Sequence, residues 1–243
     1  MKKFLALFNV RTWITLAIAL MATFFTIHYN FQIHHNFLLL GLLIVFPVVK
    51  SFQFAFKRRE RALEYLSVFR GGLTTVNQFF QHAGKLSPEN KVIGRDMIIR
   101  TSDVLINYLK TRQPGIKEVY AQLDQVSVFL QQHHEEIGGK TVSLIIRYMR
   151  EVQVSTTYLI SLTRHRTVLF LRMLALAFIN IFPLIHAPLM NNMFSEWPGL
   201  IYVLTSVTGL VLITLYNVQY QLENPFDERG YDDIKLEDFR VML

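Results

Sequence analysis

Residues 36–64 read NFLLLGLLIVFPVVKSFQFAFKRRERALE, and the architecture of the chain follows from them. An apolar run passes here into a basic, helix-favouring segment with no loop signal between the two. The uncharged residues 37–49 rise only about 20 Å as a helix, whereas the hydrocarbon layer of a bilayer is about 30 Å thick. Residues 51–56, after Lys50, are again uncharged and carry three phenylalanines. We therefore expect a membrane helix that includes Lys50 and continues into the aqueous phase.

Lys50 has two interpretations at this depth. Its side chain either extends along the helix to the lipid headgroups or faces water inside a protein-lined cavity. The first requires only a long, flexible side chain. The second makes this helix part of the lining of an aqueous path.

The composition indicates a protein that is partly in the bilayer and partly in water. The chain has 243 residues, a mean hydropathy of +0.28 and 18% charged residues, which is too apolar for an ordinary soluble domain and too charged for a wholly membrane-embedded one. Cysteine is absent, which excludes disulfides and thiolate metal sites. Apolar residues recur at helical spacing and none at strand spacing, so we predict an all-α membrane protein.

Three further runs have the length and composition of membrane helices. They extend from Thr12 to about Tyr29, from Met173 to about Met190, and from Trp197 to Leu222. Aromatic residues stand near the ends of the first and last runs, where amphipathic rings settle at membrane interfaces: Trp13, Tyr29, Trp197, Tyr202, Tyr216 and Tyr220. With the helix around Lys50, the sequence predicts four spans.

The distribution of basic residues predicts the orientation. All 25 Lys and Arg fall on one side of a four-span arrangement or at its interface, and the two loops on the opposite side contain none. This bias places both termini in the cytosol, in a multi-pass protein of the plasma (inner) membrane. We expect membrane helices 1 and 2 in 1–56, a cytosolic helical domain in 57–172, membrane helices 3 and 4 in 173–222, and an acidic cytosolic tail in 223–243.

The expected cytosolic domain is basic and helical. It contains eighteen Lys and Arg against ten Asp and Glu, which either attract anions and anionic headgroups or serve only as the orientation signal. Ser87 and Pro88 are typical of a helix cap followed by the first helical residue. The segment EIGGK, 136–140, predicts a break. The following helix, with Val152 and Leu159 on its apolar face, is expected to run directly into the membrane segment at Met173.

The tail after Leu222 changes character. It holds seven acids and three bases, and Asn224-Pro225 predicts the end of the last membrane helix. The acids either coordinate a cation or form ion pairs with the basic domain. Ion pairing needs no special geometry and is the simpler interpretation.

The sequence at this point resembles the bestrophin signature, in which Asn-Pro-Phe is followed by Gly or Asp and several carboxylates. The residues of this tail motif are Gln221, Asn224, Pro225, Phe226 and Asp232. Lys50, Lys57 and Glu60 also stand at intervals similar to those of the bestrophin second membrane helix, and the four-span layout is similar over nearly the whole chain. Arg58 and Arg59 occupy the place of the paired tryptophans usual in the family, and the aromatic pore positions carry smaller residues here.

This resemblance implies a homopentameric ion channel, usually selective for anions such as chloride, with some cation-selective members. The second helix of the family forms a hydrophobic neck from one residue per turn, which implies Gly41, Val45 and Val49 here. Positions 41, 45, 49, 52 and 56 share one helical face, and a ring of Lys50 just below the neck would favour anions. The expected pore-lining residues are Gly41, Val45, Val49, Lys50, Phe52 and Phe56. Ordinary helix packing is the alternative role of the two valines.

No cofactor is expected. In eukaryotic bestrophins, calcium is held by acids after Asn-Pro-Phe, and Asp232 fits one such position, but Arg229 occupies the other and its cation disfavours Ca²⁺. Asp227, Glu228 and Asp233 could still offer a shifted calcium site.

Neither a metal site nor an enzyme is indicated. The pairs His34-His35 and His133-His134 are adjacent in sequence and point to different helix faces, so we expect no metal site from them. No phosphate-binding loop or nucleophile motif occurs, so an enzyme is not expected.

The expected partners are copies of the same chain, permeant inorganic ions and the lipid bilayer, without nucleic acid. A second hypothesis is a membrane-anchored helical interaction or scaffold protein that has no conducting pore. A cation-selective channel of the same family is a further alternative.

Overall fold

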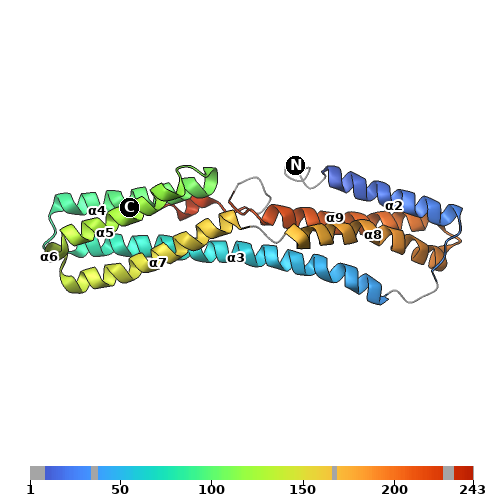
Figure 1. Cartoon of the computed structure of the whole chain (residues 1–243), viewed down its shortest axis with the longest axis horizontal. Coiled ribbons are helices and arrows are strands. Elements are labelled where there is room, and N and C mark those ends of the chain that lie inside the picture. Colours follow the sequence, from blue (N-terminus) through green and yellow to red (C-terminus); the bar gives the residue numbers. More distant parts are fainter. Residues whose placement is uncertain (1–8, 34–37, 166–168, 227–232, 243) are drawn as a thin grey trace. The chain divides into compact units, whose positions relative to one another are not determined.

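The computed structural model describes residues 9–33, 38–165, 169–226 and 233–242, with the backbone alone for 38–44 and 169. The helices in chain order are α2 (Val10–His28), α3 (Leu38–His82), α4 (Pro88–Thr111), α5 (Ile116–Gln132), α6 (His134–Ile137), α7 (Gly139–Arg164), α8 (Leu169–Phe194), α9 (Pro198–Leu222) and the 3-10 helix η1 (Leu236–Phe239) (Figure 1). These described ranges contain no strand, which confirms the predicted all-helical class.

The chain divides into two compact units. Unit 1 comprises Met1–Lys57 and Arg166–Glu223, and unit 2 comprises Arg58–His165 and Asn224–Leu243. Helix α3 contributes its first part to unit 1 and its second part to unit 2. The apolar run and the basic segment after it are thus one uninterrupted helix, as the absence of a loop signal predicted.

Unit 1 is a bundle in which α2, α8 and α9 each pack against the other two (Figure 1). Helix α2 begins where the side-chain oxygen of Asn9 accepts hydrogen bonds from the backbone N–H groups of Arg11 (3.0 Å) and Thr12 (3.3 Å). The first part of α3 joins the bundle through Val48, which is buried with Ile179 of α8 and Ile213 of α9.

Three helices of unit 1 are long and apolar enough to cross a membrane: Val10–His28, Phe170–Phe194 and Pro198–Leu222. These helices make the chain a membrane protein. The predicted fourth span, in α3, is not among the helices that meet this criterion in the described residues. The side chains of 38–44 lie outside the described residues, and the charged segment from Lys57 follows soon after the apolar run.

Unit 2 is organised around the second part of α3 and helices α4, α5 and α7. Five fully buried side chains of α3 recur every three or four residues and form one face: Leu66, Phe69, Leu73, Val76 and Phe80. Helices come close where glycine permits. A Cβ at Gly72 would lie 2.6 Å from Cγ2 of Val152 on α7, and one at Gly94 of α4 would lie 3.0 Å from the Phe80 ring.

The local signals at the ends of helices are confirmed in unit 2. The hydroxyl of Ser87 accepts a hydrogen bond from the backbone N–H of Asn90 (3.2 Å), and Pro88 is the first residue of α4. The predicted break at 136–140 is present at Gly138, whose φ of 88° lies in the left-handed region that favours glycine.

The prediction that the last helix of this unit runs directly into the next membrane segment is wrong. Helix α7 ends at Arg164, and His165 has extended backbone angles. The carbonyl oxygens of its last turn accept hydrogen bonds from side chains instead of from a further helical turn: Arg58 donates to Leu162, and Arg112 donates to Thr163 (3.2 Å). These donors come from α3 and from the end of α4, so the local sequence gave no sign of them.

Candidate functional site

The part of α3 that belongs to unit 1 has one face packed against the other helices of that unit. Val48, Ser51 and Ala55 are at most 3% exposed, and their spacing of three and four residues puts them on one side of the helix. Because this face is occupied by the bundle, it is not the face that would contact an aqueous path.

Of the predicted pore-lining residues, Val45, Val49 and Phe56 lie on a neighbouring, exposed face, and Phe52 is half-buried beside them. Val45, Val49 and Phe56 are 36%, 42% and 38% exposed in the single chain, and the ring of Phe52 contacts that of Phe56 edge-on, with centroids 4.8 Å apart. The prediction that these positions share a face agrees with the observed helix. Gly41 lies within α3, in the segment 38–44 for which the structure describes the backbone alone.

Lys50 projects from a different side of α3. Each residue turns the helix by about 100°, so Lys50 is roughly 100° from Val49 and further from Val45. Its ammonium lies over the ring of Phe46, 5.4 Å from the centroid. The structure therefore groups Lys50 with Phe46 and separates it from the valine face.

A buried polar chain connects α3, α8 and α9 within unit 1. The side-chain amide of Gln219 donates hydrogen bonds to the hydroxyl of Ser51 and to the carboxylate of Glu223 (3.4 Å). Glu223 in turn lies 3.1 Å from the guanidinium of Arg172. Gln219 and Glu223 are 1% and 3% exposed, so this ion pair and its amide are shielded from solvent.

The sequence analysis did not predict this series of buried polar contacts. Arg172 and Glu223 are far apart in sequence, and no local pattern pairs them. The available signal was their position, since Arg172 is the last base before one uncharged run and Glu223 is the first acid after the next. Two opposite charges at the ends of neighbouring spans are free to meet once those spans pack.

A second polar cluster lies at the start of α2. The side-chain amide of Asn9 donates to the side-chain oxygen of Asn217 (3.0 Å), and the amide of Asn217 donates to the hydroxyl of Thr12 (3.0 Å). Tyr216, which the sequence placed in an aromatic belt at the interface, is only 4% exposed. It packs inside the bundle, whereas Tyr220, one turn later, is 43% exposed.

The bestrophin-like tail motif begins at Gln221 in the last turn of α9, and its residues from Asn224 on belong to unit 2. Phe226 is 1% exposed and belongs to the apolar core of unit 2, and the carbonyl of Pro225 accepts a hydrogen bond from the N–H of Ile234 (2.9 Å). Gln221 and Asn224 are half-buried. Asp232 lies outside the described residues, as do the other positions relevant to a calcium site: Asp227, Glu228 and Arg229.

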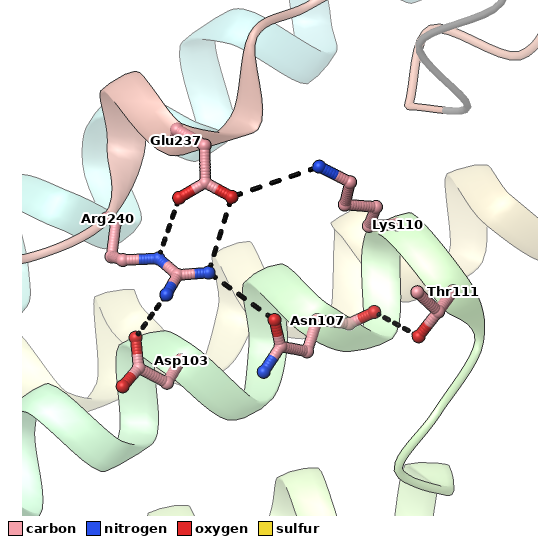
Figure 2. A network of polar contacts seen from close by, with 6 residues as sticks. All are labelled: Asp103, Asn107, Lys110, Thr111, Glu237 and Arg240. Atoms are coloured by element: carbon pink, nitrogen blue, oxygen red, sulfur yellow. Dashed lines mark hydrogen bonds and ion pairs between the residues drawn. The ribbon is translucent and has the colours of Figure 1, made fainter.

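The described part of the tail is bound to α4 by ion pairs. Figure 2 shows Arg240 between Glu237 (3.0 Å) and Asp103 (3.4 Å), with a hydrogen bond to the side chain of Asn107 (3.4 Å). Lys110 lies 3.9 Å from Glu237. These contacts are of the ion-pairing kind predicted for the tail, although in one of them the tail supplies the base and the helical domain supplies the acid.

Arg58, in the place of one of the family's paired tryptophans, and the nearby Arg61 both connect α3 to α7. Arg58 donates to the carbonyl of Leu162, as described above, and Arg61, one turn later, donates to the hydroxyl of Tyr158 (3.2 Å). This second hydrogen bond raises the pKa of Arg61. The ring of Tyr158 stacks on that of Tyr65, with centroids 3.9 Å apart.

Comparison with solved structures identifies the fold. No family model matches the sequence, and no curated protein is similar to it at a significant level. Solved structures are similar over 94% of the chain. Two are variants of a bacterial bestrophin homologue from Klebsiella pneumoniae, one with a TM-score of 0.79, 14% identity and 92% of its own chain covered, the other with a TM-score of 0.72, 15% identity and 93% covered. A third, described as a membrane protein, has a TM-score of 0.74, 13% identity and 93% covered.

At identities this low, the similarity concerns the course of the backbone, and it extends over both units. It agrees with the tail motif and the helix pattern that suggested the same family from the sequence. This chain has the bestrophin fold.

Proposed function

We propose that this protein is a homo-oligomeric ion channel whose α3 helices surround an aqueous path, with five copies as the resemblance to bestrophins implies. The observation that carries the proposal is the division of α3 into two faces. Val48 and Ser51 are buried against their own bundle, whereas Val45 and Val49 are unpacked in the single chain. The helices of one chain cannot enclose a wide pore, but identical helices around a symmetry axis can.

The proposed neck consists of rings of Val45 and Val49, with Gly41 above them and Phe52 and Phe56 below. Small apolar rings of this kind control permeation by wetting and dewetting rather than by charge. The spacing of one residue per turn supports this arrangement, because successive rings then stack along the axis.

Chloride is the proposed permeant ion. The chain has a net charge of +7, which raises the concentration of anions near a path through the oligomer. Lys50 lies off the valine face, so its contribution is through the electrostatic potential below the neck rather than through direct contact with an ion in the neck.

We also propose the membrane placement that the basic residues predict. The first part of α3 is the fourth span, unit 2 and both termini lie in the cytosol, and the protein resides in the plasma membrane. The absence of Lys and Arg from the two loops opposite the termini supports this topology.

Ion flux from liposomes tests the proposal. Purified protein reconstituted in liposomes is expected to release chloride, and the Val45→Ala/Val49→Ala variant is expected to release it about tenfold faster, which corresponds to a barrier lower by about 1.4 kcal/mol. Val68→Ala is the matched control, because Val68 is on α3 in unit 2 and is 39% exposed. An equal increase in chloride release by the Val68→Ala control would contradict the assignment of Val45 and Val49 to the neck.

The same preparation distinguishes the alternative functions. A reversal potential near the equilibrium potential of the cation would identify a cation-selective channel. An absence of flux from protein that elutes as a folded monomer would overturn the channel proposal and favour a membrane-anchored scaffold.

A further inference from the structure

Arg11 is held at one end of unit 1 by aromatic rings. Its guanidinium carbon lies 4.9 Å from the centroid of the Tyr220 ring and 5.8 Å from that of Tyr216. Tyr216 is buried and Tyr220 is 43% exposed, so the guanidinium is supported by the bundle on one side and accessible beside the outer ring. At these distances the guanidinium is attracted electrostatically by the faces of the rings.

Among the described residues, no acid pairs with the positive charge of Arg11. In the part of the chain that the structure describes, Arg11 forms no ion pair and its side chain makes no hydrogen bond. A second guanidinium, that of Arg172, lies 6.0 Å from the same Tyr220 ring, and it is paired with Glu223. Among the described residues, these two cations and one carboxylate leave an excess positive charge around Tyr220.

The guanidinium N–H donors of Arg11 are suited to bind a phosphate. In the described residues the side-chain N–H groups of Arg11 donate to no protein acceptor, and their fork geometry suits bidentate contact with phosphate oxygens. Arg11 also directly precedes the uncharged run of the first span, so it lies at the depth where headgroup phosphates occur. A zwitterionic headgroup would bring its own cation near the two guanidinium groups, whereas an anionic headgroup would not.

We propose that Arg11, supported by Tyr220 and flanked by Arg172, binds the phosphate of an anionic membrane phospholipid. The site requires neither ion conduction nor an oligomer, because Arg11, Arg172, Tyr216 and Tyr220 all belong to unit 1 of a single chain. Its ligand is selected by the excess positive charge and by depth in the membrane, not by a pocket.

Quenching of a single tryptophan by brominated lipid tests the site directly. Tyr220→Trp keeps an aromatic ring beneath Arg11, and Trp13→Phe with Trp197→Phe removes the two native tryptophans. In vesicles that mix phosphatidylglycerol and phosphatidylcholine, one of them brominated, we expect about fivefold preferential quenching by the anionic lipid, the factor typical of one basic residue at an anionic surface.

Arg11→Gln in this background is expected to abolish the preference. Arg95→Gln, which removes the same charge from an exposed position in unit 2, is expected to leave it intact. An unchanged preference in Arg11→Gln would overturn the proposal. Loss of the preference in both variants would also overturn it, because the net charge and not the site would then attract the lipid.

Inorganic phosphate distinguishes a lipid headgroup from a soluble anion. At constant ionic strength, replacing chloride by millimolar phosphate is expected to leave the quenching ratio unchanged. If free phosphate removed the preference, the site would bind phosphate from solution and the lipid assignment would be wrong. Native mass spectrometry of the wild-type chain and Arg11→Gln checks the result without the Tyr220→Trp change: the wild type is expected to retain more phosphatidylglycerol, and equal retention would contradict the site.

Discussion

Unit 1 and unit 2 are both helical, but polar side chains make up a larger share of the buried residues in unit 1 than in unit 2. Unit 2 buries apolar residues such as Phe69, Phe80, Ile98, Leu105, Val126 and Ile145. Unit 1 buries the hydroxyls and amides of Thr12, Thr15, Thr23, Thr26, Asn191, Asn217 and Gln219, and it exposes Trp13, Phe24, Phe25, Val203, Val207 and Val211. The same chain therefore follows two packing rules.

The difference indicates the solvent that each unit meets. In water, burial of apolar surface drives helices together, which requires the continuous core of unit 2. Between lipid chains that drive is absent, and helices associate through close packing of small residues and through hydrogen bonds. Unit 1 shows both, since Thr15 donates to Asn180 (2.9 Å) and Gly209 faces Thr15 and Ala19 of α2.

The largest expected effect would test the core of unit 2. Phe80 is fully buried and contacts the Phe129 ring edge-on, with centroids 5.4 Å apart. Phe80→Ala is expected to destabilise unit 2 by about 3–5 kcal/mol through lost burial and a cavity. Hydrogen exchange should show this loss in α4 and α5 and leave α8 and α9 unchanged. Equal loss in α8 and α9 would contradict two separately packed units.

The next effect concerns the buried charges of unit 1. Arg172→Met is expected to cost about 3 kcal/mol, because it leaves Glu223 buried without the guanidinium. Arg172→Met with Glu223→Leu removes both charges and is expected to recover most of that loss. Thermal unfolding in one detergent compares the two variants with the wild type. A double variant less stable than the single one would show that the pair stabilises unit 1 beyond the removal of an uncompensated charge.

The smallest effect concerns the attachment of the tail to unit 2. Arg240→Ala removes contacts to Asp103 and Glu237, whose side chains are 36% and 53% exposed, so the expected loss is about 1 kcal/mol or less. Exchange of the Val241 amide, which donates to Ser102 (2.9 Å), reports this loss locally. The difference from the wild type should shrink as salt is raised, since exposed ion pairs are screened. A difference that grows with salt would exclude an electrostatic origin.

Much of the fold was accessible to sequence reasoning because its causes are local. The cap at Ser87 and the break at Gly138 depend on neighbouring residues, and helical spacing predicted the shared face of Val45 and Val49. The expected continuation of α7 into the membrane was wrong because Arg58 and Arg112, distant in sequence, cap its last turn.

The candidate site was only partly accessible. Apolar membrane segments carry little periodicity, because lipid-facing and buried positions are both apolar. The sequence did not indicate that Val48 packs inward while Val49 does not, or that Tyr216 is buried while Tyr220 is exposed. The contact of the Lys50 ammonium with the Phe46 ring was likewise not indicated by the sequence.

By itself, the sequence determined that the chain is helical, that much of it is apolar enough for a membrane, and where most helices begin and end. Hydrogen bonding within a helix and the length of an apolar run depend on adjacent residues alone. Only the tertiary structure decided which face of α3 stays unpacked, that Arg172 meets Glu223, and that Arg11 rests on Tyr220. Those features depend on how helices distant in sequence pack, and hydrophobic patterning does not specify that packing.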